Sequence, residues 1–581
     1  MSPSAIFPTR YNIPHTFPAL CLLLVAWCLS PTLSLASTGV SDNAPAPSFY
    51  IGFGEDCCGE DPHPVHGITT ADGGYAVVGK SMDTSGNQDG FILKFNGDSL
   101  SGTSFMEAED FSNYGWSQTI GSNGNMDGFN NVVSTSSALF ASGFKYANGA
   151  TIDRYLVKYD LATGSKIWEA TLADPSSARD GAYESMLITA DGGMVLTGVM
   201  NAQPGSIEGF KSYGNPSDGS AFLEYFTADQ LSSNGAPQSS AWITTLAGAN
   251  SGKGVRQLPN GSYIVAALDA DEGAGHVFQV SASGDVQWSN QYPDHGEITD
   301  VAILTENGSA QGIVLVGHYH PEQGGIDGSI TRLSLSGDVV WHKAVGNPVG
   351  GIGAFAGLGA GNPTLIYDEC WGTQGTQDGG MVVACGTGIE GCGEYSTGSA
   401  IHTECMQDPR RTWRALLVKL DKNGNEVWHR VDSFLEPGET EAPDSASEYV
   451  SLHDDGAVVS IVDQGFGIGV LVLQPQSSNA PGDASDTSGD SGTGGNCDDT
   501  GDSTTETGDE TDENDESEDN GDDESEDDDD KEDTVGASNN ASDSETESSG
   551  CSAASQPTYG YSISWMLLTF LATGLYRRRL V

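Results

Sequence analysis

Short segments of alternating apolar and polar residues recur between residues 48 and 474. Two such segments flank each Asp/Asn-Gly turn, and this combination predicts a tight β-hairpin. A third segment follows most hairpins, and a second turn then leads to a segment that contains a tryptophan. The sequence therefore predicts seven repeats of four antiparallel strands, with first turns at 72–75, 136–138, 191–194, 260–263, 307–309, 378–381 and 455–457.

The two ends of this repeat array complement each other. The seventh repeat stops after its third segment, 469–473, whereas residues 48–54 resemble the fourth segment at 341–346. Seven units of four antiparallel strands are typical of a β-propeller. We therefore expect an all-β, seven-bladed β-propeller over residues 48–474, in which strand 48–54 completes the last blade and removes an exposed sheet edge.

One repeat carries a family motif. The run from Asp160 to Trp168 resembles the D-x-x-T-G-x-x-x-W motif of the quinoprotein-like β-propeller superfamily and its uncharacterised secreted relatives. The resemblance extends over residues 48–474 and implies that the tryptophan packs between neighbouring blades. The positions expected to dock blades in this way are Trp116, Trp168, Trp242, Trp288, Trp341 and Trp428.

The same resemblance bears on two adjacent cysteines, Cys57 and Cys58. Quinone-dependent members of the superfamily hold a vicinal disulfide against their cofactor, and this pair has the same spacing. We favour disulfides to other cysteines, which an oxidising compartment permits. The seven repeats also differ from the eight that are usual in the quinone-dependent family.

The N-terminus has the features of a secretory signal peptide over residues 1–36, with an apolar run at 19–29 and small residues at 34–36. A short linker, 37–47, follows. Near the other end, residues 559–576 contain no charge and precede Arg577, Arg578 and Arg579. This pattern predicts a membrane-spanning helix with a basic cytoplasmic tail, 577–581, and the rest of the chain outside. A C-terminal helix packed in the core is the alternative.

The C-terminal segment also resembles a bacterial sorting signal of the myxo type, through Cys551, the apolar helix and the three arginines. The resemblance implies cleavage near Cys551 by a membrane protease and anchoring of the mature protein at the cell surface or outer membrane. A plain single-pass anchor is the alternative.

Charge is distributed unevenly along the chain. The protein has 81 acidic and 23 basic residues, a net charge of −58, and much of this charge lies in residues 475–558. That tract is rich in Ser, Thr and Gly and poor in apolar residues, so it is expected to be a disordered stalk. Calcium collection by its carboxylates is the alternative. The acidic balance argues against a nucleic-acid partner.

Three groups of residues are candidates for metal binding. Asn123, Asn125 and Asp127 place oxygen ligands at alternate positions, as in a calcium loop, or else form an ordinary polar loop. His318 and His320 follow a predicted strand, and alternation directs both imidazoles to one side. His63 and His66 lie near the adjacent cysteines, but the sequence identifies no third ligand for either histidine pair.

Four further cysteines lie around a glycine-rich insertion in the sixth repeat: Cys370, Cys385, Cys392 and Cys405. Four cysteines allow three pairings, and we favour two local disulfides that staple the insertion. Zinc is the weaker alternative, because no pair has the two- to four-residue gap typical of a structural zinc site.

The sequence contains no nucleophile elbow, Walker loop or H-E-x-x-H motif. The favoured interpretation is therefore a secreted, surface-anchored propeller that binds an unknown extracellular ligand or protein and performs no chemistry. A quinoprotein-like oxidoreductase or an extracellular polymer hydrolase that uses the propeller face is one alternative. An adhesion or structural role at the cell surface is another.

Overall fold

The computed structural model of the protein describes residues 41, 43–53, 60–82, 87–97, 102–106, 114–121, 126–147, 151–173, 178–205, 218–269, 273–320, 325–345, 367–389, 413–432, 444–464 and 467–482. The predicted signal peptide, most of the acidic stalk, the predicted membrane helix and the basic tail lie outside these residues. Within the described part of the chain, no helix is long and apolar enough to cross a membrane.

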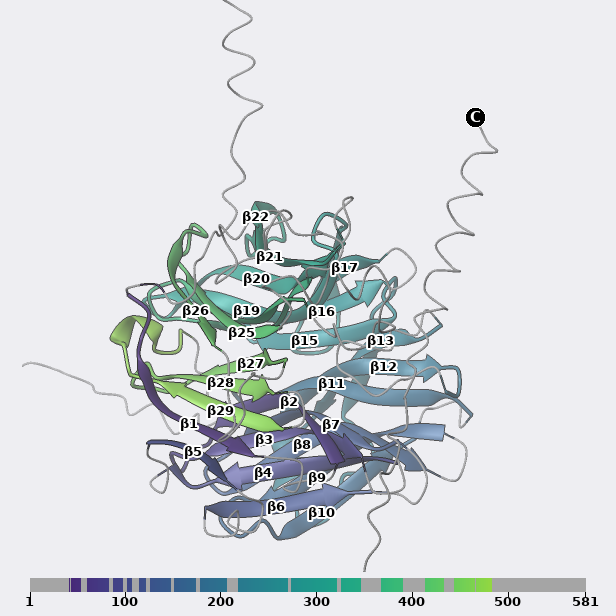
Figure 1. Cartoon of the computed structure of the whole chain (residues 1–581). Coiled ribbons are helices and arrows are strands. Elements are labelled where there is room, and N and C mark those ends of the chain that lie inside the picture. Colours follow the sequence, from purple (N-terminus) through teal and green to yellow (C-terminus); the bar gives the residue numbers. More distant parts are fainter. Residues whose placement is uncertain are drawn as a thin grey trace, which may run out of the picture. The chain divides into compact units, whose positions relative to one another are not determined.

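The strands form seven sheets, which confirms the predicted seven-bladed β-propeller (Figure 1). Blades 1 to 3 follow the order of the sequence. Blade 1 consists of β2 (Glu60–Thr69), β3 (Tyr75–Met82), β4 (Gln88–Phe95) and β6 (Gly115–Ile120). Blade 2 consists of β7 (Gly128–Ser134), β8 (Ala138–Ala147), β9 (Thr151–Asp160) and β10 (Lys166–Leu172). Blade 3 consists of β11 (Asp180–Ile188), β12 (Met194–Ala202), β13 (Ser220–Phe226) and β14 (Trp242–Thr245), with the short helix α2 (Ala228–Ser232) between its last two strands.

Blades 4 to 6 repeat the same pattern. Blade 4 consists of β15 (Ser251–Gln257), β16 (Tyr263–Asp269), β17 (Ala274–Val280) and β18 (Val286–Tyr292). Blade 5 consists of β19 (Glu297–Glu306), β20 (Ser309–Tyr319), β21 (Asp327–Leu333) and β22 (Val339–Val345). Blade 6 consists of β23 (Tyr367–Gly375), β24 (Met381–Gly388), β25 (Arg414–Leu420) and β26 (Glu426–Asp432).

Blade 7 joins the two ends of the described chain. It contains β27 (Ala446–Leu452), β28 (Val458–Asp463), β29 (Ile468–Leu473) and the N-terminal strand β1 (Pro47–Phe53). β1 pairs antiparallel with β29, so it takes the place of the missing fourth strand. The sequence did not predict a fifth strand, β5 (Gly102–Met106), which comes from the connection between β4 and β6 and pairs parallel to β1. An added strand covers a sheet edge that would otherwise be open.

The hydrophobic core lies between neighbouring blades rather than inside any one of them. The middle strands are buried on both faces, so they are nearly continuous apolar runs, as in Ile313–Val316 of β20. One core cluster joins blades 1 and 2 and includes Val78 and Val157, and another joins blades 5 and 6 and includes Val316 and Val383. The outermost strands are more exposed, and Val339 and Val340 of β22 are both more than half exposed.

The tryptophans of the fourth strands contact the next blade. Trp116 of blade 1 donates from Nε1 to the carbonyl oxygen of Leu161 in blade 2 at 2.9 Å. A Cβ added to Gly164, in the turn before β10, would lie 2.5 Å from the Trp116 ring. Gly164 has φ +68°, a conformation that glycine adopts without strain. The repeated turn glycine therefore provides both the backbone bend and the space for the neighbouring tryptophan.

The same tryptophan-to-glycine contact recurs around the ring. Trp242 lies against Gly284, Trp288 against Gly337 and Trp341 against Gly424. Trp168 and Trp428 are almost completely buried and belong to the core clusters between blades 2 and 3 and between blades 6 and 7, respectively. Each of the six tryptophans therefore lies at a junction between two blades.

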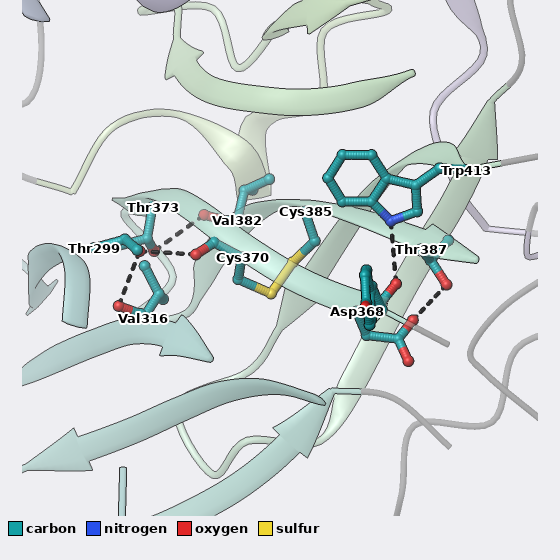
Figure 2. Close-up of a disulfide and its surroundings, with 10 residues drawn as sticks. Thr299, Val316, Asp368, Cys370, Thr373, Val382, Cys385, Thr387 and Trp413 are labelled. Atoms are coloured by element: carbon teal, nitrogen blue, oxygen red, sulfur yellow. Dashed lines mark hydrogen bonds between the residues drawn. A yellow bond between two sulfur atoms is a disulfide. The ribbon is translucent and has the colours of Figure 1, made fainter. Parts of the chain in front are cut away.

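A disulfide joins Cys370 of β23 to Cys385 of β24, which are directly paired residues (Figure 2). Both cysteines are fully buried. Thr299 of blade 5 donates from Oγ1 to the carbonyl oxygen of Cys370 at 2.7 Å, so the disulfide also lies close to the preceding blade. The bridge is local, but it links two strands inside blade 6 rather than stapling the insertion. Cys392 and Cys405 lie outside the described residues, as do Cys57 and Cys58.

Candidate functional site

The two ends of the propeller are different. Within every blade the first and third strands run in one direction and the second and fourth in the other. Connections between blades, and those from second to third strands, therefore reach one end, which we call the loop face. The hairpins from first to second strands, and the connections from third to fourth strands, reach the opposite end, the exit face.

Four long connections join strand ends at the loop face: 203–219, 346–366, 389–413 and 433–445. The exit face has two long connections, 96–114 in blade 1 and 227–241 in blade 3, and otherwise tight turns. Long loops on a rigid scaffold are where binding residues are concentrated in proteins. We therefore expect a binding site at the loop face.

The chain leaves the last blade at the exit face. Beyond β29, the segment 474–482 crosses from blade 7 to blades 6 and 5. Lys419 donates from Nζ to the carbonyl oxygen of Ser478 at 2.9 Å, and the backbone N–H of Gly482 donates to Gly375 at 3.0 Å. Gly375 is the last residue of β23, an innermost strand. The described chain therefore ends beside the axis of the ring, at the end opposite the loop face.

The innermost strand of every blade contains a β-bulge at an equivalent place. The register shifts occur at Val65, Asn130, Glu184, Lys253, Thr299, Trp371 and Glu448. A bulge bends the strand and redirects its side chains. All seven residues are buried, and two of them form an ion pair between blades 3 and 4, with 4.0 Å between Lys253 Nζ and Glu184 Oε1.

A buried arginine crosses the axis of the ring. Nη2 of Arg256 in blade 4 lies 3.4 Å from Asp300 Oδ2 in blade 5, 3.5 Å from the carbonyl oxygen of Thr373 in blade 6 and 3.2 Å from the hydroxyl of Tyr449 in blade 7. Blades 4 and 7 are not neighbours, so the guanidinium group has to reach across the centre. The ring of His66 in blade 1 lies 3.8 Å from that of Tyr449. The polar network around Arg256 thus connects four blades, and the ring contact of His66 adds blade 1.

A second cluster brings together three potential metal ligands near the loop face. His63 Nδ1 lies 2.8 Å from Asp463 Oδ2, and His63 Nε2 lies 3.9 Å from Glu448 Oε2. Among the residues that the structure describes, this is the group in which at least three His, Cys, Asp or Glu side chains offer ligand atoms within 4.8 Å of one another. His63 belongs to β2, whereas the two carboxylates belong to β27 and β28, so the cluster connects blade 1 to blade 7.

Local backbone irregularities help to place two of these three side chains. β2 has a register shift between Glu60 and His63, and Glu448 is itself the bulged residue of β27. Burial by itself would lower the pKa of His63, but the charge and hydrogen bond of Asp463, together with Glu448, raise it above its ordinary value. Lys80, the register partner of His63 in β3, opposes this effect.

Sequence reasoning selected His63 but missed both carboxylates. Glu448 and Asp463 lie near the far end of the propeller sequence, and nothing in their local sequence distinguishes them from the many other acidic residues. His66, the other histidine in that prediction, lies instead against Tyr449 at the axis.

His318 and His320 do lie close together, with ring centroids 6.4 Å apart. His318 is buried, and burial, followed by the charge of His320, lowers its pKa to about 3. Burial and His342 lower the pKa of the nearby His295 to about 3 as well. Nδ1 of His295 lies within hydrogen-bond distance of Thr331 and Ser329, so this histidine is a neutral part of the blade 5 core.

Of the predicted calcium loop, the structure describes only Asp127, because Asn123 and Asn125 lie outside the described residues. Asp127 is completely buried, and its Oδ1 accepts a hydrogen bond from the backbone N–H of Tyr146 at 2.7 Å. This carboxylate therefore supports the start of blade 2, and the calcium prediction stays a prediction.

A depression of about 280 Å³ lies at the loop face between blades 3 and 4. Its lining comes from the ends of β13, β14 and β16 and from the connection between the blades, and consists of residues 219–220, 245–250 and Asp269. Most of this lining is backbone and small side chains, which suits a small polar ligand more than an apolar one.

Comparison with known proteins gives no family. No family model matches the chain, and no curated protein matches it. The WD40 domain of Pan2 from Neurospora crassa is similar in structure, with TM-score 0.39 and 9% identity over 77% of this chain and 99% of that domain. Sqt1 from Chaetomium thermophilum has TM-score 0.32 and 11% identity over 74% and 100%, respectively. A gluconolactonase-like protein has TM-score 0.31 and 11% identity over 76% and 96%. Similarities at this level carry no argument about function, and the fold rests on the strand pairing described above.

Proposed function

We propose that this protein is a secreted interaction module that is anchored at the cell surface and binds an extracellular ligand or protein through its loop face. The observation that carries the proposal is the position of the chain exit. The described chain ends at Gly482 on the exit face, and the acidic tract and apolar segment follow it in sequence. A tether attached there leaves the loop face free to meet a partner.

The rigidity of the scaffold supports this assignment. The blades are joined by tryptophans at six junctions, by the network around Arg256 and by the pairing of β1 with β29. A rigid ring holds the strand ends that flank its loops in fixed positions, so the scaffold itself loses little conformational entropy on binding. The predicted signal peptide and the apolar C-terminal segment support secretion and surface anchoring, which belong to the same proposal.

The experiment compares the two faces in cells of the natural host. A photo-crosslinking residue is introduced at exposed positions of the loop face, Gln203 and Asp294, and at exposed positions of the exit face, Asn260 and Ser283. After irradiation of intact cells, we expect a discrete crosslinked species from the loop-face positions and none from the exit-face positions. Equal crosslinking from both faces, or crosslinking from the exit face alone, contradicts the proposal.

Surface exposure is tested separately from binding. A membrane-impermeant amine reagent or an added protease should reach the propeller in intact cells if the chain is displayed outside. A protein that becomes accessible only after lysis refutes the display part of the proposal, whatever the crosslinking shows.

A further inference from the structure

We propose that His63, Glu448 and Asp463 form a binding site for one divalent transition-metal ion, and that the ion clamps blade 1 to blade 7. This inference does not depend on the proposed function, because it concerns the closure of the ring.

The geometry matches a metal shell with an open side. One ligand atom from each of the three side chains lies within 4.8 Å of the other two, and the shortest contact is 2.8 Å, between His63 Nδ1 and Asp463 Oδ2. These distances bracket the ~3.4 Å between neighbouring ligands of a tetrahedral Zn²⁺ site with bonds of about 2.1 Å. Small rotations of the side chains are therefore enough to place one imidazole nitrogen and two carboxylate oxygens around an ion.

Solvent reaches the point where the three side chains meet. The side chains of His63 and Asp463 are 24% and 19% exposed, whereas that of Glu448 is 9% exposed. The exposure of His63 and Asp463 gives an ion access from solvent, and water or a ligand can complete its coordination. The backbone also supports the arrangement, since Glu448 and His63 both lie at register shifts that direct their side chains.

The donor set selects the class of ion. One imidazole and two carboxylates suit Zn²⁺ or Mn²⁺. Ca²⁺ needs six to eight oxygen ligands, and three side chains with a nitrogen among them do not supply these. We expect Zn²⁺ and Mn²⁺ to bind here in preference to Ca²⁺ and Mg²⁺.

The ion would join parts of the chain that lie far apart in sequence. His63 follows the N-terminal closing strand, and the two carboxylates belong to the last blade. The pairing of β1 with β29 is one link between these ends, and the metal site adds a second. A ligand that binds only the folded ring shifts the folding equilibrium toward it, by about 100-fold when the free ion is at 100 times its Kd.

The experiment measures binding and stability in the full-length protein after treatment with a chelator. Equilibrium dialysis against ZnCl₂ or MnCl₂ gives the stoichiometry, and thermal unfolding with and without ZnCl₂ gives the stabilisation. The single variants Glu448→Gln and Asp463→Asn keep the size of each side chain and remove its charge. We expect each variant to bind one tight ion fewer than the parent and to lose the increase in Tm that Zn²⁺ gives.

The control for this test is a histidine–carboxylate pair in the same blade. His453 Nδ1 lies 3.0 Å from Asp455 Oδ1 on the exit face, so His453→Gln removes a similar pair outside the cluster. We expect this variant to bind and respond to Zn²⁺ like the parent. The acidic tract is identical in all of these proteins, so ions that it collects cancel in the comparison.

Two further measurements make the test decisive. Lys80→Gln removes a positive charge beside His63, and we expect it to tighten Zn²⁺ binding several-fold. Each variant should still unfold in one cooperative transition in chelator, which shows that it folds. A parent that binds no more tight Zn²⁺ than Glu448→Gln, or a His453→Gln variant that loses as much, overturns the proposal.

Discussion

Replacing Arg256 by methionine should destabilise the propeller strongly, because it leaves a buried carboxylate without its counter-charge. The side chain of Arg256 is 7% exposed and that of Asp300 is 1% exposed, with 3.4 Å between Nη2 and Oδ2. At an effective dielectric constant of about 20, the attraction over this distance is roughly 5 kcal/mol. Breaking a buried pair by removing one partner typically costs about 3–5 kcal/mol, and we expect Arg256→Met to lower the free energy of unfolding by this amount.

A surface ion pair of the same length provides the matched control. Arg179 Nη1 lies 3.4 Å from Asp218 Oδ2, but these side chains are 35% and 36% exposed. Exposed pairs contribute about 1 kcal/mol or less, so Arg179→Met should cost at most that amount. The two substitutions thus compare the same chemistry and distance at different burial.

The assay is urea unfolding followed by tryptophan fluorescence, with the free energy of unfolding compared at matched slopes. The double variant Arg256→Met with Asp300→Asn removes both charges, and we expect it to recover at least about 1.5 kcal/mol relative to Arg256→Met alone. Equal losses for Arg256→Met and Arg179→Met would refute the reasoning. A double variant that is as unstable as the sum of the two single variants would show that packing, not charge, decides the loss.

Three other perturbations test the blade junctions, the buried histidines and the disulfide. Gly284 has φ +90° and lies against the tryptophan of the previous blade, so Gly284→Ala should lower stability by about 1–2 kcal/mol in urea unfolding, whereas Gly235→Ala, in open space, should change it little. His295 has a pKa of about 3 in the fold and about 6.5 when unfolded, so the unfolded chain binds the extra proton and stability falls as the pH decreases from 6.5 toward 3. The free energy of unfolding, measured in urea across this range, should fall less steeply for His295→Asn, by up to ~1.4 kcal/mol per pH unit. Replacing Cys370 and Cys385 together by alanine should cost about 3 kcal/mol in thermal unfolding, and an unchanged Tm would show that the bridge does not restrain the unfolded chain.

The network around Arg256 also shows why the side-chain contacts at the axis of the ring could not be predicted from the sequence. Lys253 and Arg256 lie in a strand segment with little alternation of apolar and polar residues. No local sequence pattern indicates that either side chain is buried at the axis. Their partners come from blades 3, 5, 6 and 7, whose innermost strands meet only when the ring closes. Bulges at each innermost strand then decide which side chains reach the centre, and single-strand alternation does not encode a bulge.

Sequence alone determined the repeated hairpins, the seven blades and the tryptophan positions, because turn glycines and apolar alternation act over a few residues. It also indicated that residues 48–54 resemble a missing fourth strand, and β1 takes that place beside β29. Only the tertiary structure decided that Cys370 pairs with Cys385, that His63 meets Glu448 and Asp463, and that the chain exit lies opposite the loop face. These features depend on the register between strands that are distant in sequence, and that register is fixed when the blades pack against one another around a common axis.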